Sequence, residues 1–153
     1  MFRNLSVVAL LTVSIVACGK SLTAPSPPPV VVDSIRIVNV NTPVGVLKGG
    51  AMQCGQYLHV TVEYTAKVHP SANGPLLVGV SILDDDTQIL AGAGKGANSN
   101  GLVTQVTISV EVQCDSPVTM NFVLAELFQV APLGGPTTIH ATDLEPFILR
   151  LYP

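Results

Sequence analysis

The 153-residue sequence contains no tryptophan, and only 11% of its residues are charged, against roughly 25% in an average soluble domain. The net charge is −3, and no basic cluster is available to neutralise phosphates, so nucleic acid is not an expected partner. Two signatures of nucleophilic catalysis are also missing, the Gly-x-Ser-x-Gly elbow and the Ser-x-x-Lys motif. We therefore predict a protein that is not an enzyme, with no catalytic residues and no cofactor.

The first 17 residues form an apolar segment behind a single positive charge. Arg3 is the only charged residue before Cys18, and the stretch from Leu5 to Val16 contains neither charge nor proline. A helix of this length would rise only about 18 Å, well short of a hydrocarbon core of about 30 Å. Residues 1–17 are therefore interpreted as a signal peptide rather than a membrane-spanning helix.

The residues that end this segment resemble the lipobox of bacterial lipoproteins. Ile15-Val16-Ala17-Cys18 supplies an aliphatic residue, a tolerant position, a small residue and the cysteine that receives the lipid. The resemblance covers residues 1–18 and implies that acyl chains on Cys18 anchor the mature protein in the cell envelope. Gly19 stands where an aspartate commonly retains enterobacterial lipoproteins in the inner membrane, so the resemblance favours the outer membrane, with the domain facing the periplasm or the medium.

A proline-rich linker, residues 18–32, follows the cleavage site. Its segment from Ser21 to Pro29 contains four prolines, three of them consecutive. Proline has a fixed φ and no amide donor, so this stretch should be an extended polyproline II helix with a rise of about 3.1 Å per residue. Such a linker would hold the following domain roughly 25–35 Å from the lipid.

From residue 33 to residue 153 the dominant pattern is alternation with period two. It is clearest in 56–68, where Leu58, Val60 and Val62 share one face, and in 102–113, where Ile108 and Val110 do so. Such alternation is typical of antiparallel strands with one solvated face. Weaker candidate strands are 34–40, 76–83, 88–91 and 147–152. About seven strands at this spacing predict an all-β fold, an antiparallel β-sandwich.

Three further segments could form a strand, a helix, a loop or a turn. Residues 118–131 alternate as a strand would, but Ser116 and Pro117 could also begin a helix; we favour the strand because its neighbours are strands. As a strand, this segment would place Glu126 in step with its apolar residues, unless a bulge intervenes. The glycine-rich run 92–96 is interpreted as a mobile hairpin loop, and Asp84-Asp85-Asp86 as a turn.

Two cysteines, Cys54 and Cys114, remain once Cys18 is assigned to lipidation. Cys54 precedes one clear strand and Cys114 follows the other, so antiparallel pairing would bring them together on the apolar face. An exported protein is expected to oxidise such a pair, although two reduced core thiols would also fit the pattern. Closing a loop of about 60 residues would stabilise the fold by roughly 4 kcal/mol in the chain-entropy model.

The arrangement over residues 33–153 loosely resembles an immunoglobulin-like or fibronectin III-like sandwich. It departs from antibody-type domains, because no tryptophan is present to pack on the disulfide and Val112 stands where the tyrosine corner would place Tyr. The resemblance therefore concerns architecture alone and assigns no functional residues.

Few side chains suggest a metal site. The three histidines, His59, His69 and His140, lack any short ligand spacing, and we predict that they are surface residues without a metal. Asp84-Asp85-Asp86 offers carboxylates that could help to bind calcium weakly, but it lacks the spaced acidic pattern of known calcium loops and is typical of a solvated turn.

Two functional classes remain open. The one we favour is a non-catalytic, membrane-anchored envelope module whose sandwich presents a structural or protein-interaction surface to an envelope partner. The alternative is a module that binds carbohydrate or another small ligand. Sugar binding usually relies on exposed aromatic faces, and in the clear strands only Tyr57 falls on the solvated side.

Overall fold

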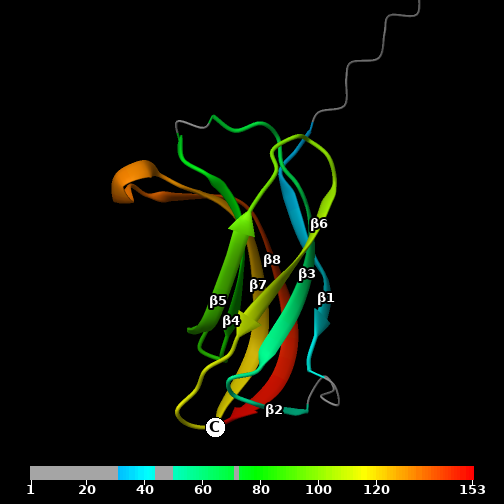
Figure 1. Ribbon diagram of the computed structural model, residues 1–153, viewed down its shortest axis with the longest axis vertical. Coiled ribbons are helices and arrows are strands. Elements are labelled where there is room, and N and C mark those ends of the chain that lie inside the picture. The colour runs from blue at the N-terminus through cyan, green and yellow to red at the C-terminus, as the bar shows by residue number, and fades with distance from the viewer. Residues whose placement is uncertain (1–30, 44–49, 71–72) are drawn as a thin grey trace, which may run out of the picture.

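The computed structural model describes residues 31–43, 50–70 and 73–153. In these residues the chain forms two β-sheets that pack against each other (Figure 1). The signal peptide 1–17, Cys18 and all but the last two residues of the linker 18–32 lie outside the described residues, so the interpretations placed on them stay predictions. No helix in the described ranges is both long and apolar enough to cross a membrane.

One sheet has three strands and the other has five. The three-stranded sheet has the antiparallel order β1 (Ser34–Asn41), β3 (Tyr57–Thr65), β6 (Thr104–Glu111). The five-stranded sheet has the order β2 (Ala51–Gln53), β8 (Thr137–Tyr152), β7 (Val118–Val130), β4 (Leu76–Leu83), β5 (Ile89–Gly96). A short 3₁₀ helix, η2 (Pro132–Gly134), connects β7 to β8.

The predicted all-β sandwich is thus confirmed, with eight described strands instead of about seven. The additional strand, β2, has only three residues, too few to show a period in the sequence, and it pairs in parallel with β8. All other pairings are antiparallel.

The core lies between the sheets and is built from the inward-facing residues of nearly every strand. In β3 burial alternates as the period predicts, with Leu58, Val60, Val62 and Tyr64 inside. Burying a residue of this kind contributes about 1.5–3 kcal/mol. The remaining core side chains include Ile35, Met52, Ala66, Val78, Val80, Ile82, Ile108, Val110, Val112, Met120, Val123, Ala125, Leu127, Phe147, Leu149 and Leu151.

The uncertain segment 118–131 is a strand, β7, and not a helix. Its register against β8 shifts between Met120 and Phe122, and as a result Met120 and Val123, three residues apart, both point inward. The alternation expected for residues 118–131 is therefore interrupted, and Phe122 does not continue the face of Met120. Beyond this bulge Ala125 and Leu127 are buried, so Glu126 faces outward, which is the outcome expected where a bulge intervenes.

The glycine-rich run 92–96 is not a mobile loop but the second half of β5, which pairs with β4 along its length. Ala91 and Ala93 pack against the core, and the glycines between and after them face outward. Alanine and glycine differ too little in polarity for this alternation to be recognised in the sequence.

The two ends of the sandwich are distinct in Figure 1. At the entry end, residues 31–33 lead into β1, and at the far end the chain finishes after β8. Cys54, just after β2, and Cys114, beyond β6, meet at the far end.

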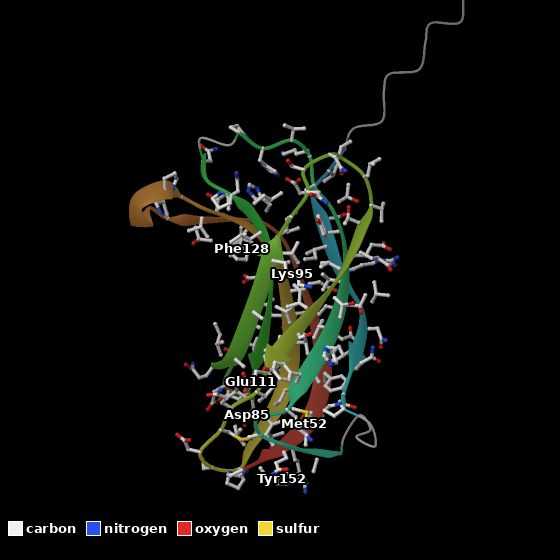
Figure 2. The ribbon with its side chains drawn as sticks, in the orientation of Figure 1. Met52, Asp85, Lys95, Glu111, Phe128 and Tyr152 are labelled. Carbon is white, nitrogen blue, oxygen red and sulfur yellow. A yellow bond between two sulfur atoms is a disulfide. The ribbon has the colours of Figure 1, made fainter. Side chains whose placement is uncertain are left out.

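Charged side chains form hydrogen bonds from one sheet to the other along both seams, the two long edges where the sheets meet. Lys95 of β5 donates a hydrogen bond from Nζ to the carbonyl oxygen of Thr107 in β6, at 2.7 Å, and Figure 2 shows Lys95 between these strands. On the opposite seam, Asp143 of β8 accepts the amide hydrogen of Ile37 in β1, also at 2.7 Å. Both contacts satisfy backbone groups on strands that end a sheet, where unpaired groups would invite further strands.

Candidate functional site

Two histidines and an aspartate meet at the entry end of the sandwich. His69 Nε2 lies 3.1 Å from Asp33 Oδ1, and His140 Nδ1 lies 4.0 Å from Asp33 Oδ2. The two imidazole rings are 4.0 Å apart between centroids and tilted by 40°. The side chains of Asp33, His69 and His140 are only 8%, 6% and 14% exposed. With Gln129, described next, these residues form what we call the histidine cluster.

Gln129 connects His140 to the backbone beneath it and is buried, with 3% of the whole residue exposed. Its Nε2 donates to the carbonyl oxygens of Gly74 at 3.0 Å and Pro70 at 3.4 Å. Carbonyls only accept, so these contacts fix the orientation of the amide and leave Oε1 to accept a hydrogen from His140 Nε2, at 3.1 Å. A neutral His140 ring therefore carries its hydrogen on Nε2 and leaves Nδ1, 4.0 Å from Asp33 Oδ2, as an acceptor.

Strand pairing explains how the cluster assembles. β1 and β3 are antiparallel and Ser34 lies opposite Thr65, so Asp33, just before β1, falls beside the residues that follow β3, among them His69. His140 is brought to the cluster by a bulge in β8. In the pairing of β7 with β8, Leu127 faces Ala141 and Phe128 faces Ile139, which leaves His140 as the extra residue of a bulge. Bulges re-aim a side chain in this way, often beside functional sites.

The surroundings of Asp33 keep it ionised. Burial raises the pKa of its carboxyl group, but this is outweighed by the hydrogen bond from the Lys67 amide, the hydrogen bond from His69 and the positive charge of Lys67, which together lower the pKa below 3.8. The Lys67 amide lies 2.9 Å from Asp33 Oδ1, and its Nζ, on a side chain that is 57% exposed, lies 3.7 Å from Oδ2. Asp33 is thus a held carboxylate with one lysine at its solvent side.

The surroundings of His140 disfavour its charged form. Burial lowers its pKa below 6.5, and the nearby His69 lowers it further, while the Asp33 carboxylate opposes both effects. Two stacked imidazoles disfavour a second positive charge between them. The histidine cluster therefore presents a carboxylate and a neutral imidazole to each other.

The prediction of three surface histidines is correct only for His59. That residue is exposed on the solvated face of β3, with Nδ1 2.8 Å from the hydroxyl oxygen of Ser109. For His69 and His140 the prediction is wrong, because spacing along the chain says nothing about residues that strand pairing brings together. The same rule that places Cys54 near Cys114 could have placed Asp33 near His69. No signal in the sequence marks the bulge that adds His140.

The cysteines stand as the sequence predicts. Tyr57 and Glu111 form the terminal pair of β3 and β6, and just beyond them the Cα atoms of Cys54 and Cys114 are 5.7 Å apart, within the distance of a disulfide. Because Cys54 continues β2 and Cys114 continues β6, this contact links the two sheets.

The Asp84-Asp85-Asp86 turn also lies at the far end, where β4 leads into β5 (Figure 2). Asp84 Oδ1 accepts the amide hydrogen of Gln88 at 2.7 Å, so this carboxylate holds the turn together. Among the described residues, the side chains that come close enough to share a metal ion are Asp33, His69 and His140, and these aspartates are not among them.

The outward surfaces of the two sheets differ in chemistry. On the three-stranded sheet, polar pairs cross from strand to strand: Arg36 to Glu63 at 2.7 Å, Glu63 to Gln105 at 3.1 Å, and Thr61 to Thr107 at 2.9 Å. On the five-stranded sheet, the register of β4, β7 and β8 gathers apolar side chains, which we call the outer sheet face. Its members are Leu77, Phe122, Leu124, Phe128, Ile139, Leu144 and Ile148.

A hollow opens in the outer sheet face where glycines replace side chains. Its lining includes Gly79, Gly94, Glu126 and Phe128. Lys95 also lines it, but the Nζ of this residue donates to the carbonyl oxygen of Thr107. Figure 2 shows Phe128 on this sheet, and its ring lies so close over Gly79 that a Cβ there would come within 2.8 Å of it. The carboxylate of Glu126 thus stands at the edge of an apolar hollow.

Comparison with known proteins gives no family to this chain. None of the family models matches the sequence, and no curated protein matches it either.

Proposed function

We propose that the chain is an envelope lipoprotein, anchored through Cys18, whose non-catalytic sandwich binds a protein partner with its outer sheet face. The observation that carries this proposal is the contrast between the two outward surfaces: one is laced with polar cross-strand pairs, and the other exposes large apolar side chains. Ile139, Leu144 and Ile148 are 55%, 51% and 56% exposed. Exposed apolar side chains gathered on one sheet face are typical of an interaction surface.

The proposed cellular location is based on the sequence. The lipobox-like Ile15-Val16-Ala17-Cys18 and the proline-rich linker would place the domain outside the cytoplasm, and Gly19 favours the outer membrane. The approach of Cys54 and Cys114 supports the same compartment, because disulfides persist where the surroundings are oxidising.

The chemistry of the partner follows from the hollow. Glu126 places a negative charge beside the apolar ring of Phe128. We infer a partner with an apolar surface that carries a basic side chain, which would enter the hollow and pair with Glu126. Complementary charges of this kind fix the register of an interface more than they add to its affinity.

Site-specific photo-crosslinking in the native envelope tests this proposal. A crosslinking amino acid at Leu144 should give a discrete adduct with another protein, and Glu126→Lys should reduce its yield. The matched probe at Ser109, exposed on the opposite sheet, should give none. Equal adducts from both positions, or none from Leu144, would contradict the proposal.

Binding of the purified protein to a glycan array would favour the carbohydrate alternative instead. Among the described aromatic residues, only Tyr57 and Tyr152 are more than a third exposed, at 48% and 46%. Sugar binding should then be lost in Tyr57→Ala or Tyr152→Ala and should survive Glu126→Lys.

A further inference from the structure

We propose that Asp33, His69 and His140 form a binding site for one divalent transition-metal ion, and that Zn²⁺ suits it best. Each residue offers one ligand atom, and these atoms all lie within 4.8 Å of one another. Two imidazole nitrogens and a carboxylate oxygen are a donor set that zinc accepts, with three protein ligands and one open position for water. The site lies at the entry end and does not use the outer sheet face.

The distances are close to those of an assembled site. Around tetrahedral zinc, with bonds of about 2.0–2.1 Å, ligand atoms lie about 3.3 Å apart. The separation of His69 Nε2 and Asp33 Oδ1 is 3.1 Å, and that of His140 Nδ1 and Asp33 Oδ2 is 4.0 Å. These two distances involve different oxygens of the carboxylate, and the three ligand atoms of one set all lie within 4.8 Å of one another. Side-chain adjustments of up to about 1.5 Å would therefore bring them around one ion.

The orientation of His140 points to a cation. Because Gln129 Oε1 accepts the hydrogen on Nε2, the Nδ1 of a neutral ring faces a carboxylate oxygen with no hydrogen between them. The two acceptor atoms are 4.0 Å apart, and a cation within reach of both would satisfy them. Metal-bound histidines characteristically donate their other ring hydrogen to a fixed oxygen, as His140 does here.

The carboxylate of Asp33 is also held by a hydrogen bond from a fixed group. The Lys67 amide donates to Asp33 Oδ1 at 2.9 Å, which orients the group from the backbone. The Lys67 ammonium, 3.7 Å from Oδ2, is the cation beside Asp33 in the structure. Its side chain is 57% exposed and can turn into solvent when a metal ion binds.

The site lies where a bound ion would connect the two sheets. Asp33 and His69 flank strands of the three-stranded sheet, whereas His140 belongs to β8 of the five-stranded sheet. A bound ion would therefore link the sheets at the entry end, as the cysteine pair links them at the far end. Binding to the folded state alone would stabilise it by mass action.

Calorimetric titration of the full chain, purified in detergent and stripped with EDTA, tests the proposal with Zn²⁺ as the probe. We expect one ion per chain, with binding weakened about 100-fold or more in His69→Gln and His140→Gln and about 10–100-fold in Gln129→Met. His59→Gln, which removes an exposed histidine outside the cluster, should bind as the wild type does. Absence of saturable binding, or equal losses in His59→Gln and His69→Gln, would overturn the proposal.

Two further measurements separate ligation from loss of folding. Lys67→Met should bind Zn²⁺ more tightly, because it removes a competing positive charge, and misfolding cannot produce a gain. Co²⁺ in place of Zn²⁺ should give the absorption of a tetrahedral nitrogen and oxygen site. Unchanged or weaker binding in Lys67→Met, or a thiolate charge-transfer band with Co²⁺, would contradict the assignment.

Discussion

The Nε2 of His140 donates a hydrogen bond of 3.1 Å to the amide oxygen of Gln129. The amide nitrogen of Gln129 in turn donates to two backbone carbonyls, those of Pro70 and Gly74. One buried amide therefore connects the loop before β4, the end of β7 and the bulge in β8. A polar network of this kind stabilises a fold only when every member is paired. The described residues satisfy that condition, because no buried side-chain nitrogen or oxygen among them lacks a partner.

Substitution of Gln129 should destabilise the protein even without metal. Gln129→Met keeps much of the volume but leaves the His140 Nε2 hydrogen and the Gly74 carbonyl without the partner that Gln129 supplies, at a cost of about 1–3 kcal/mol. The Pro70 carbonyl keeps its hydrogen bond from the Asn73 amide. Gln113→Met, at an exposed position, should stay within about 0.5 kcal/mol of the wild type. Urea denaturation in EDTA measures both values, and equal stabilities for the two variants would show that the buried amide contributes nothing.

Gly74, which accepts a hydrogen bond from Gln129, should tolerate no side chain. Its φ is +95°, and a Cβ would overlap the carbonyl group of Val130. Gly55 shares the left-handed backbone, with φ +83°, but has open space around its Cα. Both alanine substitutions cost about 1–2 kcal/mol for the backbone, and Gly74→Ala should cost about 1–3 kcal/mol more from overpacking. Denaturation midpoints that agree for Gly74→Ala and Gly55→Ala would refute this.

The cysteine pair should stabilise the sandwich by roughly 4 kcal/mol, since it closes a long loop in the unfolded chain. Cys54→Ala with Cys114→Ala should lower the free energy of unfolding by about this amount, less any native strain. Mass spectrometry after alkylation without reductant should find neither cysteine modified. Two alkylated thiols at Cys54 and Cys114 would show that they are reduced core residues.

Glu63 should titrate below its ordinary pKa because of neighbours on both adjacent strands. A hydrogen bond from Gln105 and one from Arg36 lower the pKa of this carboxyl group below 4.5, against a smaller opposing effect of desolvation. A depressed pKa adds stability above the unfolded value, and this is lost as pH falls from about 4.5 through the folded pKa. NMR titration should show the low value in the wild type and a higher one in Gln105→Ala/Arg36→Ala. An unchanged pKa in that double variant would assign the shift elsewhere.

The sequence predicts those parts of the fold in which each strand has a contrasting inner and outer face. The pattern of Leu58, Val60 and Val62 is enough to find β3 and its core side. The same pattern is lost in β5, where alanine alternates with glycine, and it misleads in β7, where one bulge reverses the faces beyond Met120.

The residues of the candidate sites are likewise predictable where they adjoin a clear strand and unpredictable where a bulge decides their position. Cys54 and Cys114 were predictable because each adjoins the end of a clear strand, and Asp33 and His69 satisfy the same condition on β1 and β3. His140 was not, since its place depends on the register shift opposite Phe128. The outer sheet face also depends on register, because the bulge near Phe122 decides that Leu124 and Phe128 point outward.

Anchoring through Cys18 is tested most directly by mass spectrometry of the amino-terminal peptide of the protein isolated from its native membranes. We predict that this peptide begins at Cys18, carries acyl chains on that residue, and is absent from a Cys18→Ser variant, which should leave the membrane fraction. A mature amino terminus at another residue, an unmodified Cys18, or a Cys18→Ser protein that stays in the membrane would contradict the proposed function.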